Sequence, residues 1–235
     1  MSKREKLHKA SSTGNNLRDI ILGGQDGLVN VLGVILAVAT AVSDVRVVLI
    51  AGLAATFAES ISMAAVAYTS TKAARDFYKA ELRREKREMK DIPDMERKEI
   101  RMIYARKGFS GALLNSIVKK ITSNKRLWLK TMMEEELHLY PDEYNHPAKD
   151  AIIVGIAALI GSLVPLISFI FLPIQTAIIG SIVLSVAVLF ITGYIKGMLT
   201  INPLRSGIEI AVIGITAALV GYVIGAVLGV ALYAA

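Results

Sequence analysis

Apolar residues dominate several runs of about 20 positions, the length that an α-helix needs to cross a membrane. These runs are approximately Ile20–Ser43, Val47–Ser70, Ala151–Leu172, Ile174–Ile195 and Gly207–Tyr233. No charge interrupts residues 151–195, and one helix of that length would be about 67 Å long, twice the hydrocarbon thickness. We therefore predict five membrane-spanning helices, with a break at Pro173 and a kink at Pro165 inside the third span.

The polar segment between the second and third spans has the punctuation of short helices. We predict a continuation of span two over Lys72–Lys90, a stop at Pro93, and helices over Asp94–Ala105, Ser110–Thr122 and Lys125–Leu137. No alternating strand pattern is present, so the expected fold is an all-α polytopic membrane protein with a small helical domain. The predicted domains are residues 1–71 with spans one and two, 72–149 with the helical domain, and 150–235 with spans three to five.

The composition agrees with a membrane protein, because 54% of the residues are hydrophobic and only 6% are aromatic. The chain contains no cysteine, which excludes disulfides, zinc–thiolate sites, iron–sulfur clusters and cysteine nucleophiles. Metal ligands would then be carboxylate, Met or His. The sequence also lacks the G-x-x-x-x-G-K-[ST] run of a P-loop, so ATP hydrolysis is not expected. We expect neither an enzyme nor a prosthetic group.

Basic residues predict the orientation in the membrane. Five of the 27 lie in residues 1–18, nineteen in 70–149 and two between spans four and five, against one in the first hairpin. The positive-inside rule places the N-terminus and the helical domain in the cytoplasm and the C-terminus outside. This bias explains the net charge of +7 without a nucleic-acid partner. The polar N-terminus lacks the features of a secretory signal, so span one is expected to stay in the mature chain.

Two acidic residues, Asp26 and Glu59, lie inside predicted spans, where an ionisable group is costly and therefore a functional candidate. Met63 follows Glu59 by four positions on the same helical face and is expected at about the depth of Asp26. Carboxylate and thioether ligands suit a divalent transition metal better than Ca²⁺ or Mg²⁺. The alternative is that Asp26 makes a local hydrogen bond near Gly23 and that Met63 only packs.

The helical domain carries acidic pairs at spacings that place them on one helical face. The candidate metal ligands are Glu85, Glu88, Glu96, Glu99, Met132, Met133 and Glu136. Basic residues surround these glutamates, so the alternative is a set of solvated ion pairs on an exposed surface.

Small residues at intervals of four form stripes for close helix contact. Gly221, Gly225 and Gly229 form one stripe in span five, and Gly33, Ala37 and Ala41 form another in span one. We predict a homodimer with span one at its two-fold axis, where Asp26 of both subunits would line one path. The span-five stripe is the candidate for packing within a subunit.

Several motifs together resemble the vacuolar iron transporter family. They are Arg18-Asp19-Ile20-Ile21-Leu22-Gly23-Gly24-Gln25-Asp26-Gly27-Leu28-Val29, Ser60-Ile61-Ser62-Met63-Ala64-Ala65, Glu81-Leu82-Arg83-Arg84-Glu85, Met132-Met133 with Glu136 and Leu137, and Gly193-Tyr194-Ile195-Lys196-Gly197. Their order, the five spans and the helical insert extend the resemblance over nearly the whole chain.

The resemblance implies a homodimer that moves Fe²⁺, and often Mn²⁺, out of the cytoplasm in exchange for protons. It assigns Asp19, Asp26 and Met63 to the translocation path and the seven candidate ligands above to a cytoplasmic metal site. One position departs from the family pattern: an acidic residue two turns before the span-two Met is replaced by Ala55. Glu59 is then the only acid near that Met, and we include it in the predicted path.

The sequence thus predicts a secondary transporter of Fe²⁺ or Mn²⁺ by proton antiport. The metal is the bound substrate, and the lipid bilayer, protons and a second copy of the chain are the other partners. The alternative is a membrane-anchored metal sensor or buffer without transport, although an anchor has no use for acids inside its spans. The expected location is a prokaryotic cell membrane, or a vacuolar membrane if the protein is eukaryotic.

Overall fold

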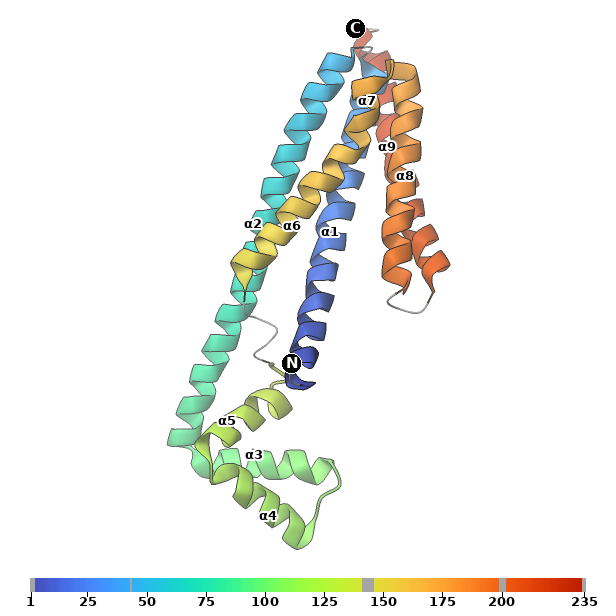
Figure 1. The fold of residues 1–235 in the computed structure, drawn as a ribbon. Coiled ribbons are helices and arrows are strands. Elements are labelled where there is room, and N and C mark those ends of the chain that lie inside the picture. Colours follow the sequence, from blue (N-terminus) through green and yellow to red (C-terminus); the bar gives the residue numbers. More distant parts are fainter. Residues whose placement is uncertain (1–2, 43, 141–145, 199–201, 234–235) are drawn as a thin grey trace. The chain divides into compact units, whose positions relative to one another are not determined.

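The computed structural model describes residues 3–42, 44–140, 146–198 and 202–233, with the side chains of 3–15 and 230–233 left out. Within these ranges the chain is helical and contains no strand, which confirms the predicted all-α class (Figure 1). The elements are α1 (Lys3–Ala41), α2 (Val45–Asp91), α3 (Pro93–Arg106), α4 (Gly111–Thr122), α5 (Lys125–Thr131), η1 (Met132–Glu136), α6 (Pro147–Leu163), η3 (Val164–Leu166), α7 (Ile167–Phe171), α8 (Ile174–Met198) and α9 (Pro203–Tyr233).

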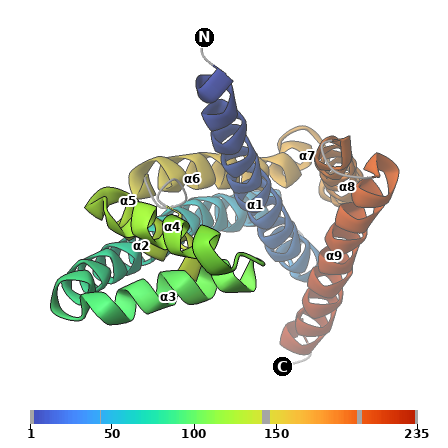
Figure 2. The same ribbon diagram turned by 90° about the horizontal axis from the view of Figure 1, so that it is seen from below.

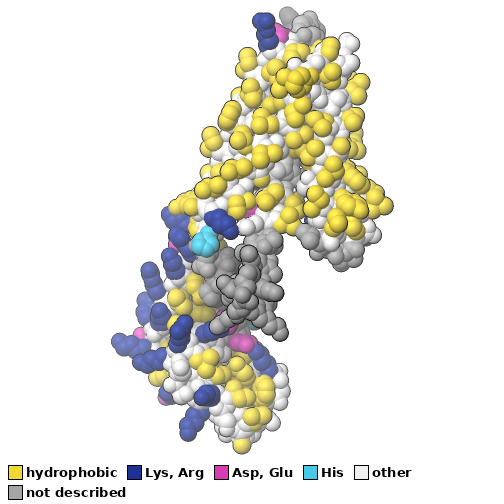
Figure 3. All heavy atoms as spheres, in the orientation of Figure 1, with side chains coloured by type: hydrophobic (Ala, Val, Ile, Leu, Met, Phe, Trp, Pro, Cys, Tyr) yellow, Lys and Arg dark blue, Asp and Glu magenta, His cyan; other side chains and the backbone are white. Residues whose placement is uncertain are grey.

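The chain divides into two compact units. Met1–Tyr68 and Ala148–Ala235 form the first, which we call the membrane unit, and Thr69–Pro147 forms the second, which we call the insert unit. Hydrophobic side chains cover the visible face of the membrane unit, whereas Lys and Arg gather on the insert unit (Figure 3). This contrast is what lipid and water as two different solvents would select.

Five helices in the described ranges are long and apolar enough to cross a membrane, as predicted. They cover Asn16–Ala41, Val45–Asp91, Pro147–Phe171, Ile174–Met198 and Pro203–Gly229. The second has 47 residues and would be about 70 Å long, more than twice the hydrocarbon thickness. Its first half, residues 45–68, is apolar and belongs to the membrane unit, and its charged second half belongs to the insert unit.

Both proline breaks lie where the sequence predicts them. The chain leaves the helical conformation between α7 and α8 at Pro173, and the α-helix is interrupted by the single 3₁₀ turn η3 around Pro165. The Ser181 hydroxyl on α8 donates a hydrogen bond of 2.8 Å to the Pro165 carbonyl oxygen. A neighbouring helix therefore satisfies part of the backbone that the interruption leaves free.

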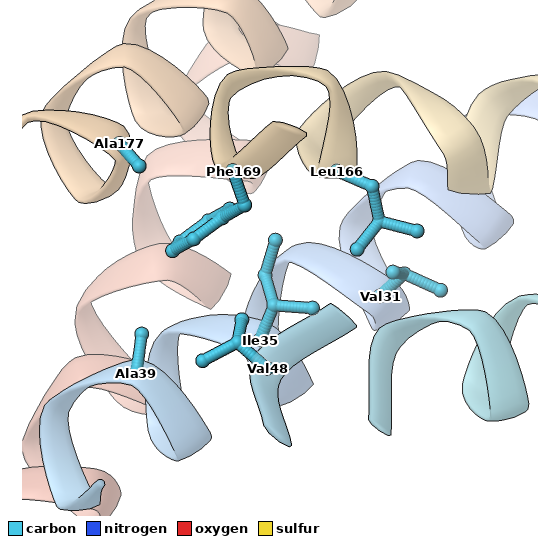
Figure 4. Close-up of a cluster of buried hydrophobic side chains, with 7 residues drawn as sticks. All are labelled: Val31, Ile35, Ala39, Val48, Leu166, Phe169 and Ala177. Carbon is cyan, nitrogen blue, oxygen red and sulfur yellow. The ribbon is translucent and has the colours of Figure 1, made fainter. Parts of the chain in front are cut away.

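The core of the membrane unit joins α1 to α2, to the η3–α7 segment and to α8 (Figure 4). Val31, Ile35 and Ala39 of α1 contact Val48 of α2, Leu166 and Phe169 near the η3 break, and Ala177 of α8. All seven side chains are buried. On another side α1 packs along α9, which also lies beside α8 (Figures 1 and 2).

The two small-residue stripes pack against each other within one subunit. A Cβ atom on Gly221 would overlap the backbone of Gly33, and one on Gly225 would lie 2.7 Å from the Ala37 Cα. The span-five stripe thus packs inside the subunit, as expected. The matching stripe on α1 is occupied by α9, so it gives no separate support for a dimer interface.

The glycines of the Gly23-Gly24-Gln25-Asp26-Gly27 motif have a packing role on α6. A Cβ on Gly23 or Gly27 would overlap the carbonyl oxygens of Val154 and Ala158, respectively. Only glycine permits this approach, because any side chain would push α6 away. The close α1–α6 contact fixes the rotation of α1 and hence the direction of Asp26.

The insert unit has an apolar core of its own. Ile100, Ile121, Trp128 and Met132 are buried together, each from a different element. The predicted helix over Lys125–Leu137 is wrong in one respect: the α-helix ends at Thr131 and continues as the wider π turn η1. The Leu137 amide donates to the Met132 carbonyl oxygen, five residues back, which defines that turn.

We predict that Gly225→Val destabilises the membrane unit by about 1–3 kcal/mol, because the new side chain meets the α1 backbone. Gly33→Ala is the matched control on the same helix pair, since its Cβ would lie 3.8 Å from the nearest atom, the Ala217 carbonyl oxygen. Thermal unfolding of the purified chain in detergent, followed by circular dichroism, measures the difference. Equal unfolding temperatures for both variants would contradict the close α1–α9 packing.

Candidate metal sites

Three glutamates from two helices converge in the insert unit. Pro93 begins α3 and holds Ile92 outside the helical region, at φ −132° and ψ 50°. The chain therefore turns sharply, and Glu96 of α3 comes to face Glu85 and Glu88 of α2. Within the described part of the chain, these side chains offer carboxylate oxygens that all lie within 4.8 Å of one another. This spacing suits ligands of one cation.

Burial distinguishes this cluster from ordinary surface acids. Glu85 and Glu96 are each only 2% exposed. The Oε2 atom of each is buried and has no hydrogen-bond partner in the structure. A buried carboxylate oxygen without a hydrogen-bond partner is strongly disfavoured unless a cation or a proton compensates the charge. The charges of these two side chains therefore require a proton or a cation at the site, because solvent does not reach them.

The other two predicted glutamates act on the same cluster. Burial raises the pKa of Glu85 to about 7, and repulsion from Glu136 and Glu88 adds to the rise. Burial also raises the pKa of Glu96 to about 8, with Glu85 and Glu99 as the next causes. For Glu136, burial is again the first cause of a raised pKa, followed by Glu99. All five glutamates singled out in the sequence are therefore electrostatically coupled.

The two methionines lie in η1. Met132 and Met133 are 0% and 2% exposed, and Met132 packs in the apolar core with Ile100 and Trp128. Single π turns occur often at functional sites, and this one contains Met132, Met133 and Glu136. Packing is the contact that the structure gives for Met132. Its thioether as a metal ligand stays a prediction.

Exposed ion pairs account for other acids of the insert unit. Arg97 pairs with Asp94 at 2.7 Å, Lys130 with Glu134 at 3.7 Å, and Lys107 with Glu135. These acids fit the solvated-surface interpretation. The solvated-surface interpretation does not fit Glu85 and Glu96, because both side chains are buried.

In the membrane unit, Glu59 faces α1. The Asn30 side-chain amide donates a hydrogen bond of 3.0 Å to Glu59 Oε1, and the Asp26 carboxyl group also interacts with Glu59. Glu59 therefore has two polar neighbours on α1, Asn30 and Asp26. Asp26 precedes Asn30 by four residues on α1, and Met63 follows Glu59 by four residues on α2. Because the two helices run in opposite directions, Asp26 and Met63 both lie one turn from the Asn30–Glu59 contact, toward the same end of the helix pair.

Asp19 lies two turns before Asp26, where the charges that act on it are those of Asp150, Arg18 and Lys149. The Lys149 ammonium donates a hydrogen bond of 3.0 Å to the Asn16 side-chain oxygen and so links α1 to the start of α6. The structure thus brings Asp26 and Glu59 together but keeps Asp19 in a separate group of charges.

Sequence reasoning missed two polar residues at these sites, Asn30 and Arg84. Asn30 follows Asp26 by one helical turn inside an apolar span, and that spacing was a signal available in the sequence. Arg84 pairs with Glu81, Glu85 and Glu88 in the insert unit. Its position three residues after Glu81 and four before Glu88 on one helix was a signal available in the sequence.

These features define a class of protein: a multi-pass helical membrane protein with acidic residues inside its spans and a buried carboxylate cluster outside them. The particular family follows from sequence similarity. The chain belongs to the VIT family, whose profile matches residues 17–226, so the resemblance stated from the motifs is confirmed.

Named relatives match over most of their length. The chain is 35% identical over 221 residues to vacuolar iron transporter 1 of Tulipa gesneriana, with 93% of this chain and 90% of the relative covered. It is 35% identical over 205 residues to vacuolar iron transporter 1 of Eucalyptus grandis, with 86% and 82% covered. A more distant relative, the vacuolar iron transporter of Plasmodium falciparum (isolate 3D7), is 29% identical over 225 residues, with 91% and 82% covered.

The raised pKa values predict how the stability of the metal-free protein depends on pH. The folded state holds protons on Glu85 and Glu96 more tightly than the unfolded chain does, because the ordinary pKa of a glutamate is 4.5. The free energy of unfolding should therefore fall as the pH rises from about 4.5 to about 8. We expect a loss of a few kcal/mol, since one pKa unit is worth about 1.4 kcal/mol.

The single tryptophan, Trp128, lies in the core of the insert unit, so its fluorescence during unfolding in EDTA reports this change. Glu96→Gln removes one of the two groups and should flatten the pH dependence. A wild-type stability that rises over this pH range would show that the carboxylates are compensated without metal.

Proposed function

We propose that the protein exports a divalent transition metal, Fe²⁺ or Mn²⁺, from the cytoplasm in exchange for protons. The observation that carries this proposal is the buried cluster of Glu85, Glu88 and Glu96, with two carboxylate oxygens that have no partner. Membership of the VIT family and relatives named vacuolar iron transporters support metal as the substrate.

The insert unit would capture the metal. At pH 7 the raised pKa values leave part of the cluster protonated, so a divalent ion must displace protons to bind. Carboxylate oxygens alone accept Ca²⁺ and Mg²⁺ as well, whereas thioether ligands from Met132 and Met133 favour a transition metal. Capture on the cytoplasmic side follows the positive-inside rule, since nineteen of the 27 basic residues lie in residues 70–149.

The path through the membrane would use Asp26, Glu59 and Met63. A divalent ion that sheds water in a low-dielectric medium needs fixed negative charge at each step. Asp26 and Glu59 supply it on facing helices, and Asn30 holds Glu59 toward α1. We place Asp19 one step nearer the cytoplasm, because it precedes Asp26 by seven positions on the same helix.

A homodimer remains part of the proposal. Two copies related by a two-fold axis near α1 would bring two Asp26 and two Glu59 side chains to one path and so double its negative charge. The small-residue stripe of α1 is used by α9, so the interface we expect lies on the faces of α1 and α2 that carry these acids. Light scattering in mild detergent measures the oligomeric state.

The capture step predicts that Glu85→Gln combined with Glu88→Gln weakens Mn²⁺ binding to the full chain by roughly a hundredfold, because ligand charge sets the affinity of such sites. The matched control combines Asp94→Asn with Glu134→Gln. It also removes two acids from the insert unit, but these are paired with exposed cations. Calorimetry at pH 7.5 compares them. Equal loss in both double variants would mean that only net charge matters.

The transport step is tested by measuring metal and proton flux together in proteoliposomes. Asp26→Asn removes a charge while keeping the side-chain shape and should abolish transport. Glu59→Gln should alter the number of protons moved per metal ion and leave Mn²⁺ binding by the insert unit intact, since Glu59 lies in the membrane unit. Wild-type flux and stoichiometry in Glu59→Gln would exclude Glu59 as a proton carrier. Metal binding without any metal flux would favour the sensor or buffer alternative.

A further inference from the structure

Arg84 lies among the carboxylates of the insert unit and touches three of them. Its Nη1 atom is 2.8 Å from Glu81 Oε2, its Nη2 atom 3.7 Å from Glu85 Oε1, and its Nε atom 3.6 Å from Glu88 Oε2. Each of the three guanidinium nitrogens thus faces a different acid, as the fixed planar fork of a guanidinium group allows.

The three contacts are unequal. The distance to Glu81 is that of a charge-assisted hydrogen bond, whereas those to Glu85 and Glu88 are longer than hydrogen bonds and represent attraction between charges. Glu81 is not among the three glutamates whose oxygens converge. Arg84 is therefore anchored outside the cluster and reaches two of its members only loosely.

The positive charge of Arg84 also acts on the carboxylates of the cluster. It opposes the rise in the pKa of both Glu85 and Glu136. Its own side chain is 45% exposed, so it lies at the rim of the cluster with room to move toward solvent. Arg83, one residue earlier on the same helix, is exposed, and no ion pair of it is described within 4.0 Å.

We propose that Arg84 is the internal counter-cation of the metal-free cluster, and that a bound divalent ion displaces it from Glu85 and Glu88 while Glu81 keeps it in place. This inference rests on the proposed function, because it assigns a competitor to the same metal site. A single positive charge partly compensates the converging carboxylates, and a divalent ion compensates them better. Arg84 thereby lowers the affinity for metal and allows captured metal to leave.

The test compares Arg84→Gln with Arg83→Gln in the full chain. Both remove one positive charge from the same helical turn, but only the first removes contacts with the cluster. We expect Arg84→Gln to bind Mn²⁺ about fivefold to tenfold more tightly than wild type, the low end of coupling between two sites. Arg83→Gln should bind as wild type does, and Arg84→Lys, which keeps the charge, should fall between them.

A second readout does not depend on metal affinity. In EDTA at pH 8, Arg84→Gln should unfold at a lower temperature than Arg83→Gln by Trp128 fluorescence, because the carboxylates lose their counter-cation. Saturating Mn²⁺ should remove this difference. A structural role for Arg84 would leave the difference unchanged by metal.

Three results would overturn the proposal. Equal Mn²⁺ affinities in Arg84→Gln and Arg83→Gln would make Arg84 an ordinary surface cation. Weaker binding in Arg84→Gln would mean that Arg84 positions the ligands instead of competing for them. A stability difference that persists in Mn²⁺ would contradict displacement. Failure of the proposed function is distinct: the Glu85/Glu88 double variant would then keep wild-type Mn²⁺ affinity, while the EDTA comparison still decides the role of Arg84.

Discussion

The cost of holding carboxylates away from water governs both halves of this protein. In the insert unit, Glu85 and Glu96 are buried with oxygens that no donor reaches. Such an arrangement is destabilising for the free protein, and selection for stability alone would replace it with apolar residues or a closed ion pair. Its presence is best understood if a cation shares the site for part of a working cycle. With pKa values near 7 and 8, a metal ion that binds this site would have to compete with protons.

The membrane unit meets the same constraint with different means. Inside the spans, Glu59 has an amide donor in Asn30 and a second acid in Asp26. These partners depend on the rotation and depth of α1, which are set by contacts far weaker than a salt bridge. Glycines on α1 let α6 approach closely, and glycines on α9 do the same along another face of α1. Close backbone packing therefore determines where the membrane acids meet.

The architecture could be predicted almost completely because its signals are local. Span length, the proline breaks near Pro165 and Pro173, and the helical stop at Pro93 each depend on a few neighbouring residues and on the solvent around them. The wider turn over Met132–Glu136 escaped prediction, because its sequence is compatible with an ordinary α-helix. The use of the α1 small-residue stripe escaped too, because a stripe shows that close contact is possible and does not identify the partner.

The sequence by itself determined the class of the protein, its spans and the residue types able to bind a divalent metal. Those properties follow from transfer free energies and ligand chemistry, which each side chain carries wherever it lies. Only the tertiary structure decided which acids meet. Spacing gave Glu85 and Glu88 one helical face, but the turn at Ile92 was needed to bring Glu96 against them.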